Sequence, residues 1–93
     1  MPSYRTIMTV TTLAPGRAPE EVEAAARSVT RLESWDIAIA SGQPRLTARF
    51  TAIDDAEAAA THAAITDAVR AVAEVPRARL ASVVRGRSHY LTP

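Results

Sequence analysis

The fold is decided by one stretch, Trp35-Asp36-Ile37-Ala38-Ile39-Ala40-Ser41-Gly42-Gln43-Pro44-Arg45-Leu46-Thr47-Ala48-Arg49-Phe50-Thr51. Large apolar residues alternate with polar or small ones on both sides of its centre, which is the period of two expected for half-buried strands. A two-residue loop at Gly42-Gln43, with glycine first, fits a type II′ hairpin. The stretch therefore predicts two antiparallel strands, 35–40 and 45–51, joined by a tight turn.

The predicted turn fixes which residues of the hairpin lie opposite each other. The facing pairs would be Ile39 with Leu46, Ile37 with Ala48, and Trp35 with Phe50. Every large apolar side chain then falls on one face, whereas a slip by one residue would mix the two faces. The other face would carry an ion pair between Asp36 and Arg49.

A helix is predicted on each side of this hairpin. Pro19, followed by two glutamates, suits the first turn of a helix because its missing N–H is not needed there. Asp54 can cap a second helix, and Glu57 stands where a capping box places an acid. We expect this second helix to run to about Glu74, before Pro76.

Two further strands complete the predicted fold, one from Tyr4 to Leu13 and one from Arg79 to Arg85, both rich in β-branched or aromatic residues. The order β-α-β-β-α-β predicts an α+β, ferredoxin-like domain over residues 1–93, with residues 86–93 as a polar tail. Right-handed crossovers give a four-stranded antiparallel sheet, order 4-1-3-2, with both helices on one face. The facing of the first and last strands stays open, because neighbouring positions in each are both apolar.

Composition narrows the functional classes. Hydrophobic residues make up 47% of the chain and charged residues 23%, which indicates a folded domain. The net charge of +1 does not by itself require nucleic acid or a membrane. No cysteine is present, and the two histidines are far apart, so we expect no disulfide, no metal site and no cofactor. We expect a cytoplasmic bacterial protein with no membrane partner, since no stretch is apolar enough for a signal or a membrane span.

The open face of the predicted sheet is the first candidate site. It would show Asp36, Arg45, Thr47 and Arg49. The arginines could bind an anion or nucleic acid, or the face could pack on a second copy of the chain. The only aromatic residue of that strand, Phe50, points toward the core, which disfavours base stacking.

Two smaller candidates lie elsewhere in the chain. His62 falls on the apolar stripe of the second helix, where it could titrate in a pocket or simply bond to a neighbour. The tail carries Arg85, Arg87 and His89, which could bind nucleic acid or meet an acidic helix of a partner. His62 is the one residue to which a catalytic role could be given.

Local segments resemble those of known groups with this topology. Leu13-Ala14-Pro15-Gly16-Arg17 followed by Glu20-Glu21-Val22 resembles the turn into the first helix of the dimeric α+β-barrel proteins, which include the antibiotic-biosynthesis monooxygenases. Ala56-Glu57-Ala58, with His62 beyond it, resembles the start of their second helix. The chain departs from many of them at Ile53, where they carry a tryptophan. The fold also resembles ACT-like domains, which bind small ligands between subunits.

Three functions follow as expectations. The first is a homodimeric interaction or ligand-binding module without catalytic activity, because a thin core is stabilised when a second subunit covers it. The second, implied by the barrel resemblance, is a cofactor-free monooxygenase or isomerase acting on a small organic molecule, with His62 and Tyr4 or Trp35 in a pocket. The third is nucleic-acid binding through the basic sheet face, which the sequence disfavours.

Overall fold

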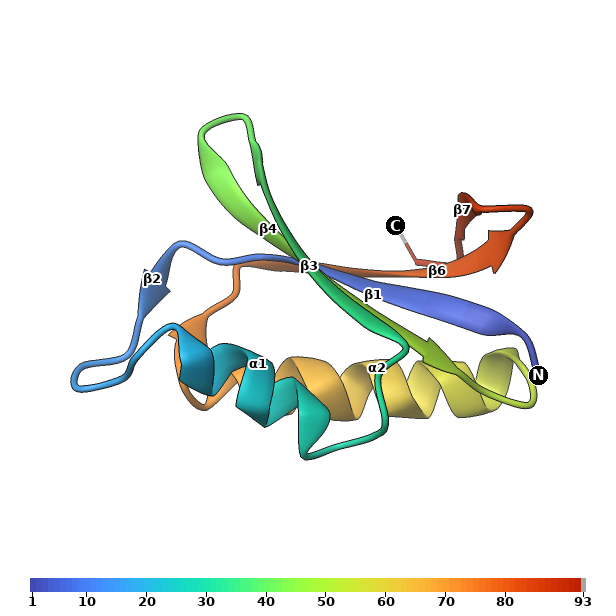
Figure 1. Ribbon diagram of the computed structural model, residues 1–93, viewed down its shortest axis with the longest axis horizontal. Helices are drawn as coiled ribbons and strands as arrows, with labels where there is room; N and C mark the ends of the chain where they lie inside the picture. The colour runs from blue at the N-terminus through green and yellow to red at the C-terminus, as the bar shows by residue number, and fades with distance from the viewer. Residues whose placement is uncertain (93) are drawn as a thin grey trace.

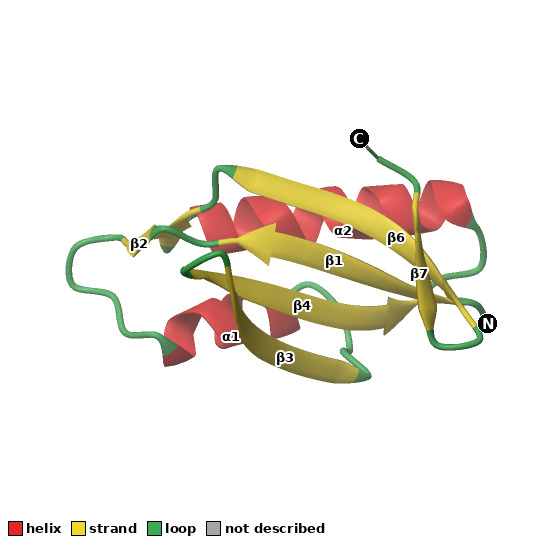
Figure 2. Ribbon diagram, turned by 90° about the horizontal axis from the view of Figure 1, so that it is seen from above, coloured by secondary structure: helices red, strands yellow, loops and turns green. Residues whose placement is uncertain are grey.

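The computed structural model describes residues 1–92 as two layers, a large sheet with two helices against one of its faces (Figures 1 and 2). The helices are α1, Glu20–Arg27, and α2, Asp55–Arg70. The strands are β1 (Ser3–Thr9), β2 (Thr12–Leu13), β3 (Ser34–Ala40), β4 (Gln43–Thr51), β5 (Ala73–Glu74), β6 (Arg77–Val84) and β7 (Arg87–Tyr90). Helix α2 lies behind β1 and β6, and α1 lies behind β4 and β3 (Figure 2).

The predicted four-stranded sheet is wrong, because the main sheet has five strands in the order β3-β4-β1-β6-β7. The additional strand lies in residues 86–93, which we predicted to be a polar tail. Arg85 and Gly86 have φ values of 52° and 78° and form a two-residue turn, so Arg87–Tyr90 can pair antiparallel with β6. The α+β class holds, since two helices and an antiparallel sheet make up the described chain.

A second, two-stranded sheet forms where more helix was predicted. Helix α2 ends at Arg70 rather than near Glu74, and β5 pairs antiparallel with β2. The Arg70 guanidinium donates hydrogen bonds of 3.2 and 3.1 Å to the carbonyl of Val75, which holds the chain as it leaves the helix. The small sheet ties the connection between β1 and α1 to the end of α2.

The central hairpin turns at a different pair of residues than predicted. Ser41 and Gly42 have φ values of 53° and 77°, so the turn is of type I′, whose twist matches that of the flanking strands. The facing pairs are Ile39 with Pro44, Ile37 with Leu46, and Trp35 with Ala48. Because this register differs from the predicted one by two residues, every side chain keeps its predicted face.

The core settles the facing of the outer strands. The buried, helix-facing residues of β1, β4 and β6 are Tyr4, Thr6, Met8, Leu46, Ala48, Phe50 and Leu80. By alternation, Arg5, Ile7 and Thr9 of β1 lie on the opposite face. We call this the open face, because both helices lie on the other side of the sheet (Figure 1).

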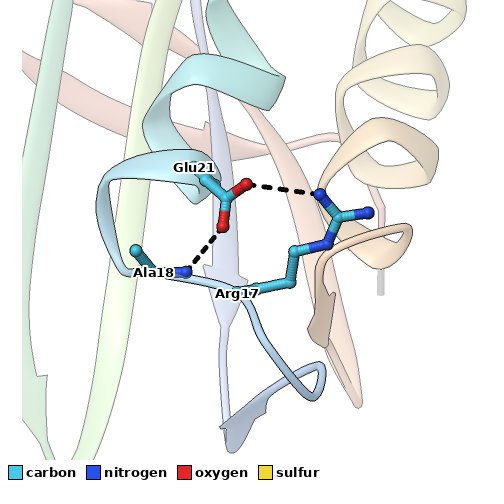
Figure 3. A network of polar contacts seen from close by, with 3 residues as sticks. All are labelled: Arg17, Ala18 and Glu21. Carbon is cyan, nitrogen blue, oxygen red and sulfur yellow. Dashed lines mark hydrogen bonds and ion pairs between the residues drawn. The ribbon is translucent and has the colours of Figure 1, made fainter.

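Glu21 holds the start of α1 (Figure 3). Its carboxylate accepts a 2.6 Å hydrogen bond from the backbone N–H of Ala18 and a 3.2 Å bond from the Arg17 guanidinium. These contacts, the backbone bond first, favour the ionised carboxylate and lower the pKa of Glu21 below its ordinary value. The helix that begins here has only eight residues, so it covers a limited part of the sheet.

Removing the cap of α2 is expected to lower the free energy of unfolding by about 1 kcal/mol. The Asp54 carboxylate accepts a 2.8 Å hydrogen bond from the backbone N–H of Glu57, as the sequence predicts. Asp54→Ala leaves that N–H without a protein partner. Urea unfolding checks this, with Asp67→Ala as the control that removes an equal charge from an exposed position in the last turn of the helix. Equal losses in the two variants would contradict a capping role.

Candidate functional site

An apolar pocket of about 400 Å³ opens between the start of α1 and the β3–β4 hairpin. Its size falls in the range of small-molecule sites, roughly 300–1,000 Å³. Eight of its ten lining residues are apolar and none is charged. They are Val10, Leu13, Pro19, Val22, Trp35, Ile37, Pro44 and Leu46, together with Thr11 and Thr12. The pocket therefore suits an apolar ligand.

The pocket opens where the tip of the hairpin rises away from the helix layer (Figure 1). Ile37 and Ile39 face the helix side, yet 64% and 70% of their surfaces are exposed. An apolar patch thus continues from the pocket to β3, which is an edge strand of the main sheet.

The open face brings the predicted residues Asp36, Arg45 and Thr47 together around one hollow of about 280 Å³. Arg49 lies apart from them, because its Nε is 3.7 Å from Glu33 Oε1. The predicted ion pair between Asp36 and Arg49 is wrong, since the shifted register places Asp36 opposite Thr47. On β3 and β4, the site therefore contains Asp36, Arg45 and Thr47 but not Arg49.

Other residues complete this face, and sequence reasoning did not place them there. Arg5 of β1, and Arg77 and Arg79 of β6, join Arg45 on the same face, and Tyr90 of β7 borders it. The Arg79 guanidinium carbon lies 3.6 Å from the centre of the Tyr90 ring. The place of Arg5 could have been inferred from the sequence. Tyr4 and Met8 are large apolar residues on β1 that point inward, so Arg5, at an alternate position between them, points outward. Tyr90 could not be placed while residues 86–93 were taken for a tail.

His62 is engaged in a structural contact away from both hollows. Its Nδ1 lies 3.0 Å from the hydroxyl of Thr6, which is fully buried on β1. Burial, and then the positive charge of Arg70, lower the pKa of His62 below its ordinary value of 6.5. The apolar pocket is lined by Trp35 and not by His62 or Tyr4. The three residues assigned to a catalytic pocket are thus not brought together there.

Acidification is expected to weaken the fold through His62. Because the folded state lowers its pKa, the unfolded chain takes up this proton first, and stability falls as the pH drops below about 6.5. His62→Asn keeps a hydrogen-bonding group near Thr6 but cannot titrate. Urea unfolding at several pH values should give a flatter dependence for this variant than for the wild type. Parallel curves would contradict the assignment to His62.

Tyr4 also has a structural partner. Its hydroxyl donates a 2.7 Å hydrogen bond to the Asp55 carboxylate at the start of α2. This bond, followed by burial, raises the pKa of Tyr4 to about 12. The phenol is therefore neutral at physiological pH and serves to join β1 to the second helix.

The predicted tail residues lie at the far end of β7. Arg85 is in the turn, and Arg87 and His89 are exposed and border a separate shallow hollow. They alternate with Ser88 and Tyr90, which belong to the open-face hollow. The structure therefore does not join the tail cations to Arg45.

Residues 1–92 contain no group of three or more potential metal-ligating side chains. Within the same range, neither helix is long and apolar enough to cross a membrane. Comparison with protein families, curated proteins and solved structures gives no significant match. The resemblance to ACT-like and dimeric α+β-barrel proteins stays a prediction.

Proposed function

We propose that this protein is a homodimeric module that binds a small apolar ligand without transforming it. One observation carries the proposal, namely the apolar pocket that continues into the exposed isoleucines of an edge strand. A surface of this kind is costly to leave in water and marks an interaction site. The pocket supplies a place for the ligand, and the edge strand supplies a place for the second subunit.

The two edge strands of the main sheet, β3 and β7, differ in how well they are protected against pairing with a strand of another chain. β7 has four residues and carries Arg87 and His89, whereas β3 has seven residues with Asp36 as its one charged side chain. Charged side chains and short length are the usual protection of an edge, and β3 is longer than β7 and has a single charged residue among its seven. The second copy would therefore add to β3.

A two-fold antiparallel pairing centred on Ile37 fits the side chains of β3. It places Ile37 against its counterpart and Ile39 against the partner subunit's Trp35. Asp36 would lie opposite an alanine, so no like charges meet. The four isoleucines of a dimer contribute about 6–12 kcal/mol against an association cost of about 4–15 kcal/mol, so a micromolar Kd, about −8 kcal/mol, is the tightest association we expect.

Pairing through the open faces is disfavoured by charge. That face presents Arg5, Arg45, Arg49, Arg77 and Arg79. Two such faces in contact would bring like charges together in a poorly hydrated space, which is strongly unfavourable. The dimer we propose thus leaves both open faces exposed.

We propose no catalytic activity, because the titratable side chains lie outside the apolar pocket. The lining of the apolar pocket has no acid, base or nucleophile other than two threonine hydroxyls. His62 instead contacts Thr6, and its lowered pKa keeps it neutral. An isomerase or oxygenase acting in the apolar pocket would need a proton acceptor there. A cytoplasmic location remains part of the same proposal.

The test combines solution mass with a pocket probe. Light scattering at about 100 µM, well above a micromolar Kd, should give twice the chain mass of 9.9 kDa at low and high salt. Nile red, a neutral apolar dye, should bind and quench the fluorescence of Trp35, the chain's single tryptophan. A monomer at this concentration would refute the dimer, and unchanged Trp35 emission would refute the ligand site.

A further inference from the structure

The open face carries two hollows that are distinct from the apolar pocket. Two hollows of about 280 and 110 Å³ share Ile7, Arg45 and Tyr90 as lining residues, so they form one trough along the sheet. We name this feature the arginine trough, with the guanidinium groups of Arg5, Arg45, Arg77 and Arg79 along it. β7 forms one wall, because it curls up from the sheet on the side away from the helices (Figure 1).

The strand register places the arginines in convergent positions. Arg45 on β4 and Arg77 on β6 both lie opposite Thr9, which is on the strand between them. Neighbouring strands are about 4.8 Å apart, so the two long side chains start about 10 Å from each other and can meet above Thr9. Two residues further along β6, Arg79 lies opposite Ile7 and lines the same end of the trough.

These guanidinium groups differ in how they are held. Arg5 donates a 2.8 Å hydrogen bond to the hydroxyl of Ser88, and Arg79 stacks on Tyr90. The Arg79 Nε is buried and has no hydrogen-bond partner among residues 1–92. Arg45 and Arg77 are exposed, and within the same residues they make no side-chain hydrogen bond or ion pair. The guanidinium groups of Arg45 and Arg77 are therefore free to bind an anion, and Arg79 adds its positive charge at the same place.

The smaller hollow suits a phosphate group. It is lined by Arg45, Arg77 and Arg79, with the hydroxyl-bearing Thr9 beneath, and it has no acidic residue. Guanidinium forks match the geometry of phosphate oxygens, and several of them suit a dianion better than a single carboxylate. An anion here also relieves the mutual repulsion of the three arginines.

The larger hollow suits a polar body attached to that phosphate. Asp36, Thr47 and Ser88 line it beyond Arg45, together with Arg5, whose guanidinium is bonded to Ser88. The Asp36 carboxylate accepts hydrogen bonds and offsets part of the arginine charge, so this end suits hydroxyl groups. The volume of about 280 Å³ accommodates one sugar-sized ring.

We propose that the arginine trough binds a small phosphate ester with a hydroxyl-bearing body, the phosphate between Arg45, Arg77 and Arg79 and the hydroxyls toward Asp36. This site does not depend on the apolar pocket, and it stays open in a dimer joined through β3. A free sugar phosphate and the backbone of a nucleic-acid strand share the phosphate chemistry. The trough favours the free compound, because its larger hollow accommodates one sugar-sized body and presents Asp36 where a strand would bring further phosphate groups.

The test uses calorimetry with ribose 5-phosphate, ribose, inorganic phosphate and a short single-stranded DNA. Ribose 5-phosphate should bind more tightly than inorganic phosphate, and ribose should not bind. Arg45→Gln and Arg77→Gln should each weaken ribose 5-phosphate binding at least about tenfold, as expected for loss of a charge-assisted contact. Asp36→Asn should reduce the preference for the sugar phosphate while leaving inorganic phosphate binding unchanged or stronger.

Arg85→Gln and Arg87→Gln are the matched controls, since they remove the same charge from exposed positions outside the trough. Equal weakening by these controls would overturn the site, because the binding would then reflect net charge alone. DNA binding far tighter than that of the sugar phosphate would also overturn the proposal and identify a strand as the ligand. So would salt-sensitive self-association lost in Arg45→Gln, which would make the trough an interface.

Discussion

Phe50→Ala is expected to lower the free energy of unfolding by about 3–5 kcal/mol, the usual cost of truncating a buried phenylalanine. Phe50 is fully buried between the sheet and the helices, and its ring stacks on Tyr4 at 6.0 Å between centroids. Domains of this size have roughly 5–15 kcal/mol of stability in total. A single substitution should therefore remove a large part of the margin that keeps the chain folded.

Phe50→Leu is the matched control, since it keeps the position apolar and removes less volume. We expect a loss of about 1–1.5 kcal/mol for this variant, because the core can partly repack around leucine. Urea unfolding followed by the fluorescence of Trp35 measures both. A loss below about 1 kcal/mol for Phe50→Ala would contradict the placement of this ring in the centre of the core.

Features set by short-range patterns were predictable from the sequence. The Asp54 cap follows from the spacing of Asp54 and Glu57. The face of each residue in the hairpin follows from the period of two, and it survived even though the turn was placed one residue too late. Such features depend on local chemistry that neighbouring residues alone decide.

Features set by contacts between distant segments were not predictable in the same way. β7 depends on a turn at Arg85-Gly86, where a glycine at the second turn position was the available signal. β2 and β5 are two residues each and become strands only because the chain brings them together. Because β7 was not predicted, Tyr90 and Ser88 had no place, and the wall of the arginine trough that β7 forms could not be foreseen.

The candidate sites show the same division. Asp36, Arg45 and Thr47 were placed on one face by alternation, and the structure gathers them around a hollow. The apolar pocket was not foreseen, because it arises where the hairpin rises away from the helix layer (Figure 1), an arrangement that no single segment encodes. His62 was correctly placed on the core side of α2, but only the fold shows that Thr6 is its partner.

The double substitution Ile37→Lys/Ile39→Lys is expected to convert the proposed dimer to a monomer. Both side chains are mostly exposed in the single chain, so their replacement should cost the monomer little. In the dimer it removes the apolar contact on both sides of the two-fold axis and adds four like charges at close range. We expect the Kd to rise at least about hundredfold, measured by sedimentation or light scattering.

Ile53→Lys provides the control that separates an interface from exposed hydrophobicity in general. Ile53 is 64% exposed, as is Ile37, but it lies before α2 and away from β3. A dimer that survives Ile53→Lys and is lost in the double variant assigns the interface to the β3 edge. A dimer that survives both would contradict pairing through β3. Ile39→Lys alone extends the comparison, because Ile39 does not line the apolar pocket and Nile red should still bind to the resulting monomer.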